Sequence, residues 1–132
     1  MRTPLLRTVV GGLGYAMLDA VWLGALMTSF YRDHLRPIAR MAGGGLAPHW
    51  PAAAVVYLLL GLGVALLAVP RAASLPAAFA AGAVFGAVVY GVYDFTNYAT
   101  LRDWPFAVVL VDVAWGTFAG ALCTAAAWAW VR

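Results

Sequence analysis

Four apolar segments, each long enough to cross a lipid bilayer, make up most of this chain. They cover residues 5–30, 52–69, 75–95 and 105–131 of the 132. A helix needs about 20 mainly apolar residues to cross the hydrocarbon core. Hydrophobic residues make up 65% of the chain and charged residues 10%, too few to cover such a core in water. The sequence predicts an all-α membrane protein, an antiparallel bundle of four transmembrane helices. We expect one domain over residues 1–132, with a short interfacial segment between the first two helices.

Prolines mark the beginnings of the last three segments. Pro51, Pro76 and Pro105 stand near the helix starts, where a missing N–H has no cost. Four spans put both termini on one side of the membrane and the loops 31–51 and 94–104 on the other. The arginines divide evenly between the two sides, so their count does not orient the chain. The side with the termini has shorter, acid-free flanks, which favours cytoplasmic termini.

Three aspartates lie inside or at the end of these apolar segments. Asp19, Asp94 and Asp112 are three of five acidic residues, in a chain without lysine or glutamate. A charged side chain at the bilayer centre costs about 2.5–3.5 kcal/mol on insertion scales. At about 1.5 Å per residue, all three fall in the half of the membrane nearest the two longer loops. We expect them to line one cavity open to that side.

Aromatic side chains recur three or four residues away from each aspartate. This spacing places side chains on one helix face, and Tyr O–H and Trp N–H groups can stabilise a carboxylate away from water. A plainer interpretation is that each aspartate is a polar packing contact between helices. The predicted site consists of the three aspartates and their polar and aromatic neighbours, namely Tyr15, Trp22, Tyr90, Tyr93, Thr96, Asn97, Arg102 and Trp115.

Small residues at every fourth position predict which helices touch. The third segment has Ala78, Gly82 and Gly86, and the fourth has Gly116 and Gly120. Such stripes let helix backbones approach closely in lipid. We therefore expect the third and fourth helices to pack together, either within one chain or between two.

One short pattern occurs in two antiparallel segments. The first segment contains Asp19-x-x-Trp22, and the fourth contains Asp112-x-x-Trp115. Each copy projects one carboxylate and one indole, so a pseudo-twofold relation between the segments is conceivable.

The loop after the first segment carries a basic stripe. Arg32, Arg36 and Arg40 recur every four residues, which predicts a short interfacial helix on lipid head groups. His34 and His49 flank this loop without the i,i+3 or i,i+4 pairing that metal and haem sites use. We expect no metal site and no cofactor.

Residues 90–116 carry a recognisable signature. They contain Tyr93-Asp94-x-Thr96-Asn97-x-Ala99-Thr100-Leu101, followed by Trp104-Pro105 and Asp112-x-x-Trp115-Gly116, and the N-terminal part contains Leu18-Asp19-x-x-Trp22-Leu-Gly24 and Phe30-Tyr31-Arg32. Over most of the chain this pattern resembles a bacterial membrane-protein family, domain-of-unknown-function family 2177. The resemblance implies a four-helix protein of the bacterial cytoplasmic (inner) membrane and implies no particular reaction.

Several function classes are excluded by what the chain lacks. Without lysine there is no Schiff base for a retinal-type photoreceptor. Ser29 and Ser74 lack the G-x-S-x-G context of many hydrolases, and no glycine-rich phosphate loop is present. No contiguous basic face points to nucleic acid.

Three functions remain. The leading one is binding of a lipid or amphiphilic small molecule in a polar Asp/Trp/Tyr-lined cavity in one leaflet. The first alternative is a small proton-coupled transporter, as a homodimer, whose aspartates exchange protons for a cationic or polar substrate. The second is a lipid-modifying membrane enzyme with paired aspartates as general acid and base. The expected partners are membrane lipids and an unidentified small molecule.

Overall fold

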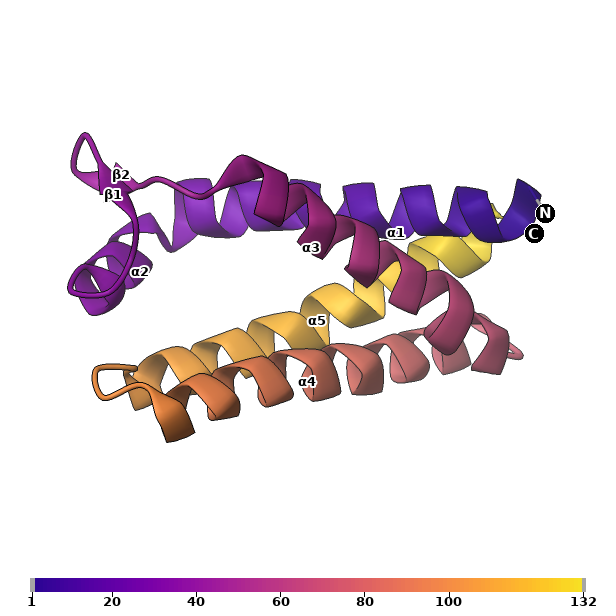
Figure 1. Ribbon diagram of the computed structural model, residues 1–132. Helices are drawn as coiled ribbons and strands as arrows, with labels where there is room; N and C mark the ends of the chain where they lie inside the picture. Colours follow the sequence, from indigo (N-terminus) through magenta and orange to yellow (C-terminus); the bar gives the residue numbers. More distant parts are fainter. Residues whose placement is uncertain (1, 132) are drawn as a thin grey trace.

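The computed structural model describes residues 2–131, most of which are helical (Figure 1). Two π-helical turns, η1 and η2, continue the first two long helices, and a 3-10 turn, η3, follows η2. The helical elements are α1 (Arg2–Val21), η1 (Trp22–Leu26), α2 (Thr28–Leu35), α3 (Trp50–Gly63), η2 (Val64–Ala68), η3 (Val69–Arg71), α4 (Leu75–Thr100) and α5 (Phe106–Trp130).

Four of the resulting segments are long and apolar enough to cross a membrane. They are Thr3–Leu26, Trp50–Arg71, Leu75–Thr100 and Phe106–Trp130. The predicted all-α membrane protein with four apolar spans is therefore confirmed.

Side chains just ahead of α3 and α4 determine where these helices begin. His49 and Ser74 each accept a hydrogen bond from a backbone N–H in the first turn that follows, at 3.4 and 3.3 Å. Pro51 and Pro76 occupy that turn, where no intrahelical partner exists for an N–H. The capping side chains and the prolines together leave few unsatisfied donors at these helix starts.

Between α2 and α3 the chain forms a small hairpin. Strand β1 (Met41–Ala42) pairs antiparallel with β2 (Gly45–Leu46). Gly43 and Gly44 form the turn with φ values of 57° and 79°, which glycine adopts without steric cost. Together with α2, this hairpin occupies the predicted interfacial segment.

Two helix ends differ from the sequence prediction. α4 continues to Thr100, so Thr96 and Asn97 are helical and Asp94 lies inside the helix. Thr100 donates its hydroxyl to the Thr96 carbonyl at 2.8 Å, which satisfies a polar side chain without ending the helix. The first span ends at Leu26, because η1 redirects the chain into α2.

The long helices form two closely packed pairs. In α4 and α5, a Cβ atom added to Gly82 or Gly86 would overlap the carbonyl oxygen of Gly120 or Gly116, respectively. This confirms the predicted glycine contact and shows that it forms within one chain. A second glycine contact joins α1 and α3, where a Cβ on Gly12 would meet the α3 backbone at 2.8 Å.

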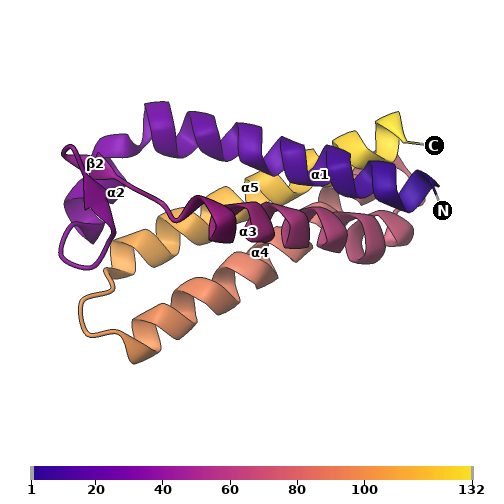
Figure 2. The same cartoon turned by 45° about the horizontal axis from the view of Figure 1, so that its top comes forward.

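Figures 1 and 2 show how the pairs are arranged. In Figure 1, α1 runs along the top and α4 along the bottom, while α3 descends from the level of α1 toward α4 and α5 rises from α4 toward α1 at the end with the termini. In both views the two termini lie together at one end. α2, the hairpin and the α4–α5 turn lie at the other end. Each of the three aspartates is closer to the end of its helix that adjoins α2 or this turn than to the end near the termini.

Candidate functional site

Asp19 of α1 is hydrogen-bonded to Trp115 of α5. The indole N–H of Trp115 donates to Asp19 Oδ1 at 2.8 Å, and only 9% of the aspartate surface is exposed. The hydroxyl of Tyr57, on α3, also lies within reach of this carboxyl group. One aspartate therefore connects three helices.

Trp22 extends this contact toward α2. Its ring stacks on Trp115, with the centroids 4.3 Å apart and the planes at 4°, and its indole N–H donates to the Tyr31 hydroxyl at 3.0 Å. Trp22 begins η1, whose wide turn closes with a 2.7 Å bond from the Met27 N–H to the Trp22 carbonyl. This turn is what brings Tyr31 back against the end of α1.

Tyr31 links Trp22 to α5 through a second hydrogen bond. The hydroxyl donates to Asp112 Oδ1, and the side chain is almost fully buried. Burial raises the pKa of the Tyr31 phenol, and so do its bond to Asp112 and the nearby negative charge. Tyr31 is therefore a neutral hydrogen-bond donor at physiological pH.

Asp94 lies beside Asp112 at the far end of this chain of contacts. Its side chain is 0% exposed, and neither carboxyl oxygen has a hydrogen bond of normal geometry among the described residues. The Asp112 carboxyl and the Trp104 indole are close enough to interact with it. We call the connected set Asp19, Trp22, Tyr31, Asp94, Asp112 and Trp115 the acidic network.

Three tyrosines surround the Asp19 end of the acidic network. Tyr15, Tyr57 and Tyr90 all lie close enough to Asp19 for an electrostatic interaction with its carboxyl group. The Tyr15 side chain is fully buried, and its hydroxyl has no hydrogen-bond partner among the described residues. The Tyr90 ring covers Gly116, where a Cβ would overlap it.

The acidic network contains carboxyl groups and neutral donors but no base. Among the side chains that the structure describes, one ion pair forms, between the partly exposed Arg32 and the exposed Asp33 at 3.0 Å. Arg102, the arginine next to the α4–α5 turn, is exposed. Among the side chains of residues 3–131, no arginine forms an ion pair with the three membrane-segment aspartates.

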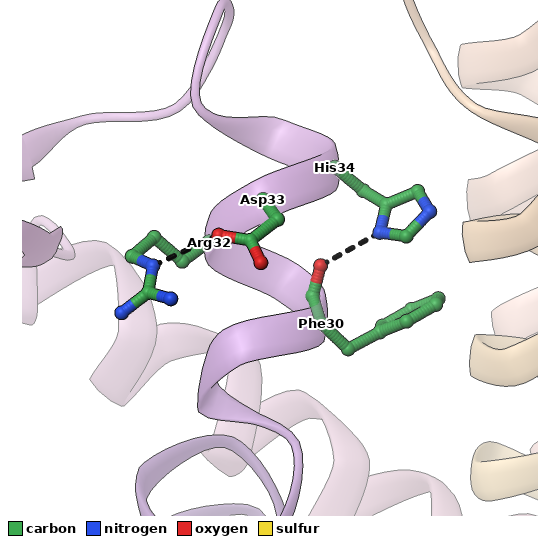
Figure 3. Close-up of polar contacts among 4 residues, drawn as sticks. All are labelled: Phe30, Arg32, Asp33 and His34. Atoms are coloured by element: carbon green, nitrogen blue, oxygen red, sulfur yellow. Dashed lines mark hydrogen bonds and ion pairs between the residues drawn. The ribbon is translucent and has the colours of Figure 1, made fainter.

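α2 separates its charged and aromatic side chains (Figure 3). Arg32 and Asp33 project from one side of the helix, and Phe30 and His34 project from the other. His34 Nδ1 lies 2.8 Å from the Phe30 carbonyl, and the two rings are 4.3 Å apart. This division leaves the buried Tyr31 free to face Asp112.

Two apolar grooves border α4. The larger, of about 570 Å³, lies between η2 and α4 and includes Arg71. The other, of about 440 Å³, is lined by α3, η2 and α4 from Val56 and Val89 to Leu66 and Leu67, and we call it the α3–α4 groove. None of the predicted site residues lines either groove.

The comparison with protein families gives one match. The family described as "Predicted membrane protein (DUF2177)" matches residues 5–129. The chain belongs to this family. The match confirms the resemblance seen in the sequence motifs and reaches into all four apolar spans. No curated protein and no solved structure matches the chain.

In this DUF2177 member, the structure brings most of the predicted site residues together. Asp19, Asp94, Asp112, Trp22 and Trp115 belong to the acidic network, and Tyr15 and Tyr90 border it.

The remaining predicted residues lie at the edge of the network or outside it. Tyr93 is 57% exposed and contacts Trp104 edge-on with the centroids 5.9 Å apart, and Asn97 lies one turn further along α4. Thr96 and Arg102 are exposed and form no hydrogen bond or ion pair with the aspartates within the described part of the chain. The extension of α4 explains Thr96, because a helix turns this position away from the Asp94 face.

Sequence reasoning missed three members of the site. Tyr31 and Trp104 stand out in the sequence only as parts of the family motifs, and Tyr57 lies in the second apolar segment without a motif. The available signals are the Phe30-Tyr31-Arg32 and Trp104-Pro105 motifs of the family resemblance, which single out two of the positions without their roles. The backbone turn at η1 that buries Tyr31 follows from no pattern in the sequence.

Proposed function

We propose that this membrane protein binds a lipid or another amphiphilic small molecule. The polar head of the ligand would contact the acidic network, and its apolar tail would lie in the α3–α4 groove. The observation that carries this proposal is the closeness of the two features. Val56 and Val89 line the groove, and each immediately precedes a tyrosine, Tyr57 or Tyr90, that lies beside Asp19.

The distribution of polar groups supports binding over passage through the membrane. Residues 52–93 contain no acidic residue, and Arg71 is their one charged side chain. The acidic side chains of the membrane segments all lie in the half nearer α2 and the α4–α5 turn, and none lies in the half nearer the termini. A one-sided site suits an amphiphile that enters from one leaflet.

Filling the groove tests the proposal. Native mass spectrometry of the purified protein should detect bound amphiphile, and Val89→Trp should deplete it at least several-fold by occupying the space of the tail. Leu13→Trp is the matched control, because Leu13 is exposed on α1 and lines neither groove. Equal ligand content in wild type and both variants would contradict the proposal.

Proton-coupled transport is a second candidate, favoured by one observation. Asp94 and Asp112 lie close enough to interact, and neither forms an ion pair with an arginine whose side chain the structure describes. Two adjacent buried carboxyl groups resist simultaneous ionisation, so the pair is suited to exchange a proton for a cationic or polar substrate. Proteoliposomes loaded with a pH-sensitive dye should show substrate-dependent proton flux, and its absence across a series of amphiphilic cations would end this candidate.

The proposed setting is the bacterial cytoplasmic membrane, with both termini in the cytoplasm. The support is the acid-free flanks on the side of the termini. A fluorescent reporter fused after residue 132 should fold and fluoresce, and alkaline phosphatase inserted in the 43–45 turn should be active. The reverse pattern would invert the orientation.

A further inference from the structure

The acidic network leaves its negative charge without a protein counter-charge. Three aspartates, two of them buried, lie within membrane segments, and none pairs with a basic side chain among the residues that the structure describes. Isolated charges are strongly disfavoured in such surroundings. Bound protons or a bound cation must therefore neutralise the network.

Asp94 has more hydrogen-bond acceptors than the protein supplies with donors. Both of its oxygens are buried without a hydrogen bond of normal geometry. The groups nearest to it are another carboxyl, Asp112, and one indole N–H, Trp104. Buried acceptors normally have hydrogen-bond partners. The Asp94 oxygens can therefore accept a hydrogen bond from a ligand.

The surroundings of the carboxyl groups are aromatic. Trp22 and Trp115 stack between Asp19 and Tyr31, and Tyr93 meets Trp104 beside Asp94. Aromatic rings attract ammonium groups, and these rings lie beside the carboxyl groups. Within residues 2–131, no three His, Cys, Asp or Glu side chains are spaced to hold a metal ion. The chemistry therefore matches an organic cation better than a metal.

We propose that the ligand of the acidic network is an amphiphile with a single cationic head group, an alkylammonium, held by Asp94 and Asp112. This inference rests on the proposed amphiphile binding and specifies its head group. A zwitterionic phospholipid fits less well, because its phosphate would meet carboxylates and no base. When the site is empty, a proton on the Asp94–Asp112 pair replaces the cation.

A series of ligands with one tail and different heads tests the charge requirement. Dodecylammonium (the protonated form of dodecylamine), dodecanol and dodecylphosphocholine would be titrated at neutral pH into the intact protein in nanodiscs made of neutral lipid, with tryptophan fluorescence as the signal. Exchange of a neutral for a charge-assisted contact predicts about tenfold tighter binding of the cation. Equal binding of all three ligands would overturn the cation inference and leave amphiphile binding intact, whereas binding of none would contradict the proposed function itself.

The location of the cation is tested with two variants. Asp94→Asn should reduce the preference for dodecylammonium over dodecanol to about that of neutral contacts, within a factor of two to three. Asp33→Asn is the control, because it removes an exposed aspartate of α2 outside the network. An unchanged preference in Asp94→Asn would overturn the assignment. Should that variant fail to fold, the ligand series on the wild type alone still decides whether the head group must be cationic.

Discussion

Trp115 and Asp19, 96 residues apart in the sequence, are joined by a 2.8 Å hydrogen bond between α5 and α1. Each residue belongs to an Asp-x-x-Trp pattern, and the tryptophan of each pattern is connected to the aspartate of the other. The indole that follows Asp112 bonds to Asp19, while the indole that follows Asp19 reaches Asp112 through Tyr31. This crossed arrangement gives the short repeat a physical role without requiring that it arose by duplication.

Trp115→Phe should destabilise the protein while preserving most of the packing. The variant keeps an aromatic ring against Trp22 but leaves Asp19 without its indole donor. Loss of a buried hydrogen bond to an ionisable group costs about 1.5–3 kcal/mol. The measurement is the free energy of unfolding in detergent, with Trp130→Phe as control, since Trp130 is 82% exposed. Equal losses in the two variants would show that the bond to Asp19 contributes nothing.

Tyr31→Phe should alter how stability depends on alkaline pH. Because the folded protein raises the Tyr31 pKa above the ordinary 10.0, the folded state holds the phenol proton where the unfolded state releases it. The contribution of Tyr31 is then complete below about pH 10 and declines as the pH rises further. Wild type should lose more stability than Tyr31→Phe between about pH 9 and 11.5. The measurement is the free energy of unfolding of both proteins as a function of pH. The same pH dependence in both would contradict a buried, Asp112-bonded phenol.

Gly86→Ala should disrupt the contact between α4 and α5. The added Cβ would overlap the Gly116 carbonyl, and backbone cannot move aside as a flexible side chain can. Overpacking of this kind costs about 1–3 kcal/mol. Gly91→Ala is the matched control on the same helix, because nothing lies within 4 Å of its added Cβ. A smaller loss of thermal stability in Gly86→Ala than in Gly91→Ala would exclude the tight contact.

The sequence was sufficient to predict the helices and one of the two helix contacts. Length and hydropathy identify the spans, and the spacing of Gly82 and Gly86 identifies the face of α4 that meets α5, because both signals are local and periodic. The contact of Gly12 with α3 was not predicted, although Thr8, Gly12 and Ala16 also recur at every fourth position.

The site was only partly predictable for the same physical reason. Helix geometry places aromatic residues beside an aspartate on its own helix, but it does not pair Trp115 with Asp19 across the bundle. Tyr31 depends on the path of the chain through η1, which is decided by tertiary packing. Thr96 and Arg102 belong to the predicted site because they are polar residues next to Asp94 in the sequence. Their exposure depends on how far α4 continues, which their polarity does not indicate.

Asp112→Asn separates a functional aspartate from one that only packs. Asparagine keeps an oxygen that can accept the Tyr31 hydroxyl and nearly the same volume, but it removes the carboxyl charge next to Asp94. If the acidic network binds a ligand, copurified amphiphile should fall several-fold while thermal stability stays equal or rises, because a costly buried charge is gone. If the aspartates serve helix packing alone, ligand content should not change and the unfolding temperature should fall. Native mass spectrometry and thermal unfolding of the same preparations measure both quantities, and Asp33→Asn provides the baseline for loss of an exposed carboxylate.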